Sequence, residues 1–271
     1  MNRVSIVLCA AALLMTAACY TNPVTGRKSL VLISQGQELS LGEASFTDIR
    51  AKEKVSHDAG MNARVNRIGR RIAQAVGNEM PDAKWEFVVF DSEELNAFAL
   101  PGGKVGVYTG LLRLAENDAE LATVMGHEIG HVIARHGAER MSEAMMMQLG
   151  GAAGAAAVGM KTDDPQTRQL FELAYGGATT VFRTLPHSRQ NELEADRMGA
   201  IFAARAGYDP RAAIRFWQKM TAQNNAKAAA GGKLSELLST HPADAKRIED
   251  LRALMPQVVP IYEQNRGKFR E

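Results

Sequence analysis

The feature that most constrains this chain is the run His127-Glu128-Ile129-Gly130-His131. Residues four apart lie on one face of an α-helix, so a helical run lets both imidazoles reach one ion. Asn117 or Asp118 can cap the start of such a helix. The segment also has an apolar side, formed by Leu121, Val124, Met125, Ile129 and Val132. The sequence therefore predicts a core-packed helix that presents two histidines on one face.

The residue types in this run favour metal chemistry. Zinc lowers the pKa of a water molecule that it binds towards about 7, and a neighbouring carboxylate can accept the released proton as the oxygen attacks a carbonyl carbon. His127 and His131 are thus candidate metal ligands, and Glu128 is the candidate general base. The alternative is a solvated helix carrying two histidines and an ordinary glutamate. We disfavour it because a third protein ligand is available.

Candidates for that third ligand lie in the segment 191–196, which again has a helical pattern. Glu192 and Asp196 are four apart and share a face, whereas Glu194 points elsewhere. Two histidines and one glutamate form a known catalytic zinc set that leaves one position open. Glu192 would then bind the metal, while Asp196 would hydrogen-bond a ligand imidazole and fix its tautomer. Spacing alone also leaves Glu194 and Asp196 open as ligands.

The rest of the pattern predicts an α+β fold that is mostly helical with a small sheet. Residues 61–76 carry a helical apolar stripe, and residues 84–90 and 104–108 resemble strands. From Leu111 onward the sequence is mainly helical. The expected interruptions are Pro165, Pro186, Pro210, Pro242 and Pro256. Strands followed by helices are typical of α+β proteins.

Composition mainly excludes classes of binding partner. The chain has 271 residues, of which 46% are hydrophobic and 23% charged, as in ordinary soluble globular proteins. The formal net charge is +2, and Lys and Arg are scattered rather than gathered in a basic patch. We therefore expect no nucleic-acid partner.

The N-terminus resembles a secretory signal. Asn2-Arg3 is followed by an uncharged run over residues 4–18, which is shorter than the roughly 20 residues of a membrane span. Ala17-Ala18 before Cys19 resembles a bacterial lipoprotein cleavage site, although Thr16 stands where such sites usually have leucine. This predicts removal of residues 1–18 and lipidation of Cys19. The alternative is a conventional signal peptide with an incidental cysteine.

Lipidation would anchor the mature chain to a membrane, since each buried methylene contributes about 0.8 kcal/mol. Removal of residues 1–18 would also take away Cys9, so that no internal disulfide could form. Tyr20, rather than aspartate, follows the cysteine, which by analogy favours an outer-membrane lipoprotein facing the periplasm. The expected divisions are a signal peptide (1–18), a turn-rich lead-in (19–50), a metallopeptidase domain (51–255) and a tail (256–271).

Several motifs together resemble one family. The run 127–131 is followed by Arg135-His136 and Glu139-Arg140, then by Ser188-Arg189 leading into Glu192 and Glu194-Ala195-Asp196. This combination is similar to the gluzincin metallopeptidases of the HtpX and CAAX prenyl protease family. Residues 96–103 also match the soluble periplasmic members of the BepA and LoiP type. The likeness covers about residues 96–241.

The resemblance implies a zincin-like fold that binds one Zn²⁺ per chain, with Glu192 as the third ligand and Asp196 behind a ligand imidazole. It also implies an edge strand beside the active-site helix, where Asn96, Ala97, Phe98 and Ala99 would pair with an extended polypeptide. Substrates would then be unfolded or misassembled envelope proteins. Members of this branch serve envelope quality control, which makes the outer-membrane assembly machinery a further expected partner.

Other residues keep two interpretations. His241 matches a recurrent family element and is a catalytic candidate: it would stabilise the tetrahedral intermediate or cap the zinc as a fourth ligand. Equally, it would serve only the turn before a helix. His136 lies off the ligand face and is assigned a structural role. Arg247 could pair with Glu192, Asp196 or substrate backbone, and a scaffold salt bridge is favoured.

Two alternatives concern function as a whole. A catalytically latent zincin-like scaffold assisting outer-membrane assembly is the main rival to an endopeptidase. It is disfavoured because the general base and all three ligands are present. A zinc amidase acting on peptidoglycan would share only the use of two histidines as zinc ligands. The uncharged segment 144–160 favours a packed helical hairpin or a mobile lid over a membrane segment.

Overall fold

The computed structural model describes residues 19–149, 165, 188–229, 235–241 and 245–268. Helices dominate, and two small sheets accompany them, which confirms the expected α+β class. Among these residues no helix is both long and apolar enough to cross a membrane.

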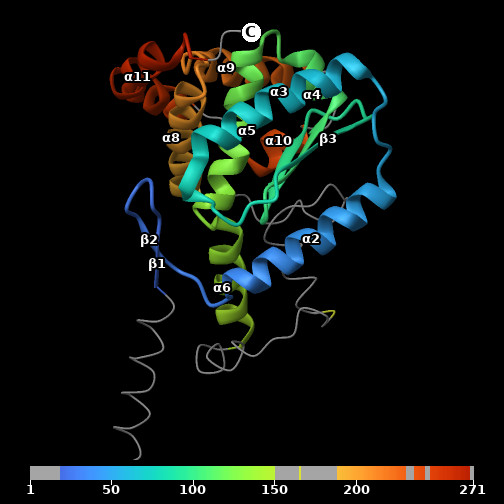
Figure 1. The fold of residues 1–271 in the computed structure, drawn as a ribbon, viewed down its shortest axis with the longest axis vertical. Coiled ribbons are helices and arrows are strands. Elements are labelled where there is room, and N and C mark those ends of the chain that lie inside the picture. Colours follow the sequence, from blue (N-terminus) through green and yellow to red (C-terminus); the bar gives the residue numbers. More distant parts are fainter. Residues whose placement is uncertain (1–18, 150–164, 166–187, 230–234, 242–244, 269–271) are drawn as a thin grey trace, which may run out of the picture.

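Helix α5 (Asp118–Ile133) runs through the centre of the fold, between α8 (Arg189–Arg205) and a three-stranded sheet (Figure 1). Asn117 is its N-cap, and the Asn117 side chain accepts a hydrogen bond from the backbone N–H of Glu120. The acidic residues Asp118 and Glu120 in the first turn complement the helix dipole. Every residue from 120 to 133 is buried, so α5 is the core helix that the sequence predicted.

The three-stranded sheet has the order β3-β5-β4, where β3 is Glu86–Phe90, β4 is Ala97–Leu100 and β5 is Lys104–Tyr108. Strand β3 runs parallel to β5, and β4 runs antiparallel to it with Ala97 opposite Val107. Within the described residues β4 pairs with β5 alone, and it packs against α5. The expected edge strand beside the motif helix is therefore where the sequence placed it.

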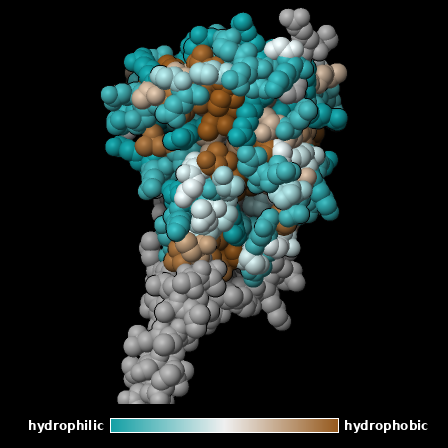
Figure 2. All heavy atoms as spheres, turned by 60° about the vertical axis from the view of Figure 1, so that its left-hand side comes forward, coloured by the Kyte–Doolittle hydropathy of each residue, from teal (hydrophilic) through white to brown (hydrophobic). Residues whose placement is uncertain are grey.

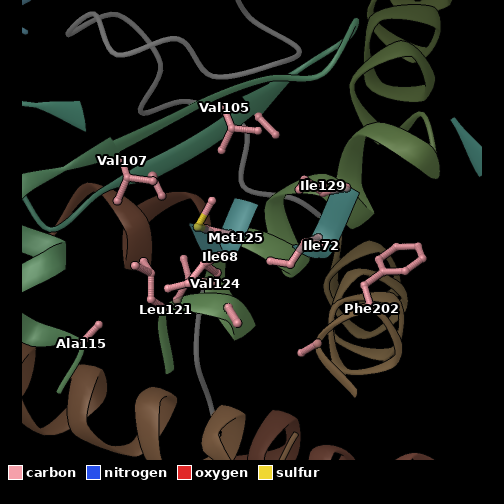
Figure 3. Packing of buried hydrophobic residues seen from close by; sticks show 14 of the residues in the cluster. Ile68, Ile72, Val105, Val107, Ala115, Leu121, Val124, Met125, Ile129 and Phe202 are labelled. Carbon is pink, nitrogen blue, oxygen red and sulfur yellow. The ribbon is translucent and has the colours of Figure 1, made fainter. Parts of the chain in front are cut away.

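Helix α3 (Ala59–Val76) covers the sheet. It begins two residues before the predicted start, because the Asp58 side chain accepts a hydrogen bond from the backbone N–H of Met61. The predicted apolar stripe is fully buried: Val65, Ile68, Ile72 and Val76. Side chains from α3, β5, α5 and α8 meet in one cluster (Figure 3). Burial of each large apolar side chain contributes about 1.5–3 kcal/mol, which fixes α5 against its neighbours.

The remaining helices are short or lie outside the central layer. They are α4 (Thr109–Leu114), α6 (His136–Leu149), α9 (Ala212–Ala229), α10 (Glu236–Thr240) and α11 (Ala245–Asn265), with a 3₁₀ turn, η1, at Gly77–Glu79. The expected interruption at Pro256 is wrong, because Pro256 and Pro260 lie inside α11. Leu254 and Val258 are buried in a cluster with Ala200 of α8, and this packing offsets the cost of a proline in a helix.

The lead-in is more regular than its turn-rich sequence suggested. Strands β1 (Cys19–Thr21) and β2 (Lys28–Leu30) form an antiparallel hairpin, and α2 (Gln35–Lys52) follows it. Ser34 and Gln37 form a reciprocal capping box at the start of α2. Helix α2 then packs beneath the sheet (Figure 1). Of the segment 144–160, residues 144–149 belong to α6, and the remainder lies outside the described residues.

Figure 2 shows the side of the molecule that carries the left-hand elements of Figure 1. This face is largely hydrophilic, with hydrophobic residues gathered in a band through its middle. The candidate site residues His127, Glu128, His131 and Glu192 are buried rather than displayed on this surface.

Candidate metal centre

Four buried side chains converge from three parts of the chain. His127 and His131 come from α5, Glu192 from the first turn of α8, and His241 from the residue that ends α10. One donor atom of each lies within 4.8 Å of all the others. The two Nε2 atoms of His127 and His131 are 3.1 Å apart. Each of these Nε2 atoms lies 3.4 Å from an oxygen of Glu192.

Helices α5 and α8 can approach closely because glycines face one another across the contact. A Cβ on Gly126 would lie 2.9 Å from the carbonyl oxygen of Gly199, and a Cβ on Gly130 would lie 3.1 Å from that of Ala195. The absence of side chains here brings the first turns of α8 against the motif helix. Glu192 is thereby carried to the two histidines, although 61 residues separate it from His131.

Asp196 supports His127 from behind. Its Oδ1 lies 2.9 Å from Nδ1 of His127, on the side of the ring away from the cluster. Arg247 in turn donates to Asp196, with 2.6 Å from Nε to Oδ2 and 2.8 Å from Nη2 to Oδ1. A carboxylate at Nδ1 leaves Nε2 as the nitrogen that offers its lone pair to a metal. The contact is the one expected for Asp196, and its part in supporting a metal ligand stays a prediction.

Arg247 joins the scaffold as a buried salt-bridge partner. Its Nη1 lies 2.9 Å from Oε2 of Glu192, and its guanidinium stacks 3.9 Å from the centre of the Trp217 ring. The favoured scaffold role agrees with these contacts. One arginine thus balances two buried carboxylates, those of Glu192 and Asp196, which would otherwise be costly to bury.

Glu194 points away from the cluster, as its position on the helix predicted. Its Oε2 lies 2.9 Å from Nε2 of His136, and Nδ1 of His136 lies 2.9 Å from Nδ1 of His131. His136 therefore contacts a candidate ligand from the side opposite the cluster. Its place off the ligand face predicted only a structural role for His136, and helical spacing does not predict this contact.

Glu128 is 5% exposed, and its Oε1 has no hydrogen-bond partner among the described residues. The same oxygen lies 3.6 Å from Nε2 of His241. Burial raises the pKa of Glu128 above its usual value, although His241 and His127 partly oppose this rise. A buried carboxylate oxygen without a hydrogen-bond partner, beside three imidazoles and a second carboxylate, belongs to a donor set that fits a divalent cation such as zinc.

The ligand candidates differ in their protonation. Burial alone would lower the pKa of His127, but Asp196 and Glu192 raise it to about 9. Burial holds the pKa of His131 well below its usual value. Burial would raise the pKa of Glu192, yet His241 and Arg247 hold it well below its usual value. Glu192 is therefore ionised, and His127 is more basic than an ordinary histidine. Once His127 loses its proton, its ring nitrogen and the Glu192 carboxylate can both bind a cation.

The proposed substrate strand, β4, packs against α5, the helix that carries the two histidines. The backbone oxygen of Asn96 accepts a hydrogen bond from the backbone N–H of Tyr108, which fixes the register of β4 on β5. Ala97, Phe98 and Ala99 are buried as whole residues. Cys19, the proposed lipidation site, is exposed and begins β1.

Comparison with known proteins places the chain in a family. The model of peptidase family M48 matches residues 60–255. The mitochondrial metalloendopeptidase OMA1 of Saccharomyces cerevisiae is 31% identical over 255 residues, which are 90% of this chain and 71% of that protein.

Two further relatives are about twice as long as this chain. The beta-barrel assembly-enhancing protease of Escherichia coli is 29% identical over 92% of this chain and 50% of its own length. Human mitochondrial OMA1 is 29% identical over 89% of this chain and 47% of its own length. This chain therefore belongs to peptidase family M48; the family and its named relatives make it a metalloendopeptidase, and its structure holds a buried His–Glu cluster that could bind a metal.

Proposed function

We propose that this chain is a zinc-dependent endopeptidase that hydrolyses peptide bonds in extended polypeptides. The observation that carries the proposal is the convergence of His127, His131 and Glu192, with Glu128 on the same helix as the two histidines. Two histidines and a glutamate are a catalytic zinc set, and the family membership points the same way. When bound, zinc would polarise the scissile carbonyl and make a water molecule acidic enough to attack near neutral pH.

Glu128 would act as the general base and then as the general acid. Its carboxylate accepts a proton from the attacking water as the new C–O bond forms, and it then delivers that proton to the amine as the C–N bond breaks. A carboxyl group whose pKa is raised by burial suits the first step, because a more basic carboxylate accepts the proton of the attacking water more readily. Asp196 would keep His127 in the ligating tautomer throughout.

The proposed substrate path runs along β4. Asn96 bonds to β5 through its carbonyl oxygen, and hydrogen bonding alternates along antiparallel strands. The backbone groups of Ala97 and Ala99 therefore face away from β5. We propose that an extended segment pairs with them by β-augmentation and reaches the cluster beside α5. A folded protein could not offer such a segment, which favours unfolded or misassembled substrates.

A second candidate function is a catalytically latent form or scaffold. The observation that favours it is His241, whose Nδ1 lies 2.9 Å from Oε1 of Glu192 and 3.3 Å from Nε2 of His127. A fourth protein ligand would close the position that a catalytic site leaves open. The same nearness suits a role in stabilising the tetrahedral intermediate. His241 also ends α10, so the turn role stands beside both.

Anchorage and location are proposals that rest on the sequence of residues 1–20. We propose that lipidation of Cys19 tethers the chain to the outer membrane, facing the periplasm. The name of the relative from Escherichia coli makes β-barrel assembly a candidate process. The mitochondrial relatives give no support for envelope substrates. Acyl-chain mass spectrometry on Cys19 would test the anchor, and an unmodified mature Cys19 would reject it.

The activity is tested with three forms of the full chain in mild detergent: wild type, Glu128→Gln and Glu120→Gln. Glu120 is the matched control, because it is also buried on α5 but bonds to Lys219 instead of facing the cluster. We expect wild type and Glu120→Gln to degrade an unfolded protein, and Glu128→Gln to lose activity while retaining about one zinc per chain. Zinc binding without cleavage by wild type would favour the latent form, with His241→Ala as the next variant. Absence of zinc from all three would reject the proposal.

A further inference from the structure

Glu194 connects the candidate metal site to the N-terminal hairpin (residues 19–30). On one side its Oε2 lies 2.9 Å from Nε2 of His136. On the other side Asn22 donates to its Oε1 from 2.8 Å, and Thr25 and Arg27 donate to its two carboxylate oxygens. The side chain of Glu194 is only 5% exposed. A carboxylate from α8 is thus surrounded by donors that come from α6 and from the first residues after Cys19.

The contacts define where the protons lie. A metal bound at Nε2 of His131 would leave a proton on Nδ1 of that ring. Nδ1 of His136, 2.9 Å away, must then accept this proton's hydrogen bond. His136 accordingly carries its own proton on Nε2, which it donates to Glu194. The carboxylate therefore fixes the tautomer of His136, and His136 in turn holds the ring of His131.

We propose that the N-terminal hairpin belongs to the metal site, with Arg27 as a positioning residue that orients His131 through Glu194 and His136. This inference rests on the proposed function, because it assigns a role to residues that hold a zinc ligand. Asp196 supports His127 directly. The hairpin supplies the corresponding support for His131 through two intervening residues, Glu194 and His136. The fold would then couple the segment next to Cys19 to the geometry of the metal site.

The contacts of Arg27 suit a positioning role. Its guanidinium makes a two-pronged salt bridge to Glu139, with Nη1 2.8 Å from Oε1 and Nη2 2.7 Å from Oε2, while its Nε donates to Glu194. Glu139 lies on α6, one turn after His136. Arg27 thus fixes Glu194 relative to the helix that carries His136. Lysine could not reproduce this fork, because it offers a point charge without a planar array of donors.

A second attachment ties the hairpin to the end of α5. The Tyr20 hydroxyl donates to the backbone oxygen of Ile133 from 2.5 Å, and the guanidinium of Arg135 lies 5.1 Å from the centre of the Tyr20 ring. Arg135 has a φ of 56°, so the chain leaves α5 in the left-handed region before α6 begins. The hairpin therefore contacts the turn that determines where His136 lies relative to His131.

The test measures zinc affinity of the full chain in detergent, by competition with a chelator, for wild type, Arg27→Met, Arg27→Lys, Glu194→Gln and Arg64→Met. Arg64 is the matched control: its side chain is 24% exposed against 17% for Arg27, and it bonds to Asp118 at the opposite end of α5. Loss of groups that support a ligand typically weakens metal binding 10–100-fold. We expect the zinc affinity to fall roughly tenfold or more in Glu194→Gln and roughly three- to tenfold in Arg27→Met. Arg27→Lys should show an affinity between those of wild type and Arg27→Met, and Arg64→Met should bind zinc as wild type does.

Absorption spectra of the Co²⁺-loaded forms test positioning separately, because a residue that only stabilises the fold would leave the visible bands unchanged. We expect the visible bands to shift in Glu194→Gln and Arg27→Met, because the orientation of His131 changes, but not in Arg64→Met. Asn22→Ala removes the amide donor to Glu194 and also the acceptor of the Val24 and Thr25 backbone N–H groups. It replaces Arg27→Met if that variant does not fold, with a smaller loss of affinity in the same direction. If Glu194→Gln and Arg27→Met bind zinc within twofold of wild type and their spectra are unchanged, this inference is overturned while the proposed function stands. A wild type that binds no zinc would overturn the proposed function and this inference together.

Discussion

Gly199 of α8 lies directly against the backbone of His127, because a Cβ on Gly199 would come within 2.7 Å of the His127 backbone nitrogen. Real Cβ atoms essentially never approach a neighbour so closely. Only glycine therefore allows α8 to reach α5 at this point. Glu192 and Asp196 precede Gly199 on the same helix, so this contact sets their distance from the histidines.

Replacement of Gly199 by alanine should damage both stability and metal binding. We expect a destabilisation of about 1–3 kcal/mol, because the added methyl overpacks the contact between α5 and α8. Zinc affinity should fall as well, since Glu192 is displaced from His127. Urea unfolding of the chelated protein and chelator competition measure the two effects. Gly36→Ala is the control: Gly36 lies in α2, where an added Cβ would meet nothing within 4 Å, and its replacement should be neutral or stabilising by up to about 1 kcal/mol. Equal behaviour of the two variants would contradict the prediction.

Asp196→Asn should weaken zinc binding with little loss of fold. The amide keeps the shape of the carboxylate but removes the charge that supports His127 and balances Arg247. We expect a loss of affinity of roughly 10–100-fold, as for other groups that support a ligating histidine. Asp209→Asn provides the control, since Asp209 is also paired with an arginine, but its bonds go to Arg211 rather than to a histidine of the cluster. A zinc affinity equal to that of the control would show that Asp196 has no part in the site.

Local pattern was sufficient for α3, α5, β3 and β5, whereas β4 was expected only from the family resemblance. The apolar stripe of α3 and the capped, apolar-faced α5 follow from spacing, because tertiary packing here agrees with local preference. The choice of Glu192 over Asp196 did not follow from spacing. Both share a face of α8, and only the approach of the two helices at Gly199 places Glu192 against the imidazoles.

The contact of His136 with His131 was beyond a helical-wheel argument. That argument treats residues 127–136 as one helix, whereas α5 ends at Ile133 and Arg135 turns the chain through the left-handed region. His136 consequently returns towards His131 on a new helix. The hairpin was missed for a related reason. Its strands are three residues long, and the donors that Arg27 offers find their partners only through contacts more than 100 residues apart.

Pairing of substrate with β4 predicts an effect of Ala99→Pro. Proline removes the backbone N–H of residue 99, which faces away from β5, and an edge strand tolerates this loss. One hydrogen bond contributes about 0.5–1.5 kcal/mol, so KM for an unfolded protein should rise roughly two- to tenfold. The value of kcat and the zinc affinity should stay near those of wild type. Ala99→Ser keeps the N–H at similar volume and is the control. A KM for Ala99→Pro equal to that of Ala99→Ser would reject pairing at this residue.

Asp118 should make the stability of α5 depend on pH. Burial would raise the pKa of Asp118, but hydrogen bonds from Arg67 and Arg64 lower it below its usual value. A folded-state pKa below the unfolded value of about 3.9 means that the ionised group stabilises the fold above about pH 4, and that this stabilisation is lost as the pH falls further. Asp118→Asn should therefore lower the free energy of unfolding at pH 7 by roughly 1 kcal/mol.

The difference between wild type and Asp118→Asn should shrink at pH 3, where the aspartate of the unfolded chain is largely protonated and the contribution of its charge to stability is being lost. Urea unfolding at both pH values measures this difference in the free energy of unfolding. The protein is kept free of metal by a chelator. Asp48→Asn on the exposed face of α2 is the control, and its effect should stay within about 0.5 kcal/mol at both pH values. A difference for Asp118→Asn that is equally large at pH 3 and pH 7 would mean that the side chain stabilises α5 through its shape rather than its charge.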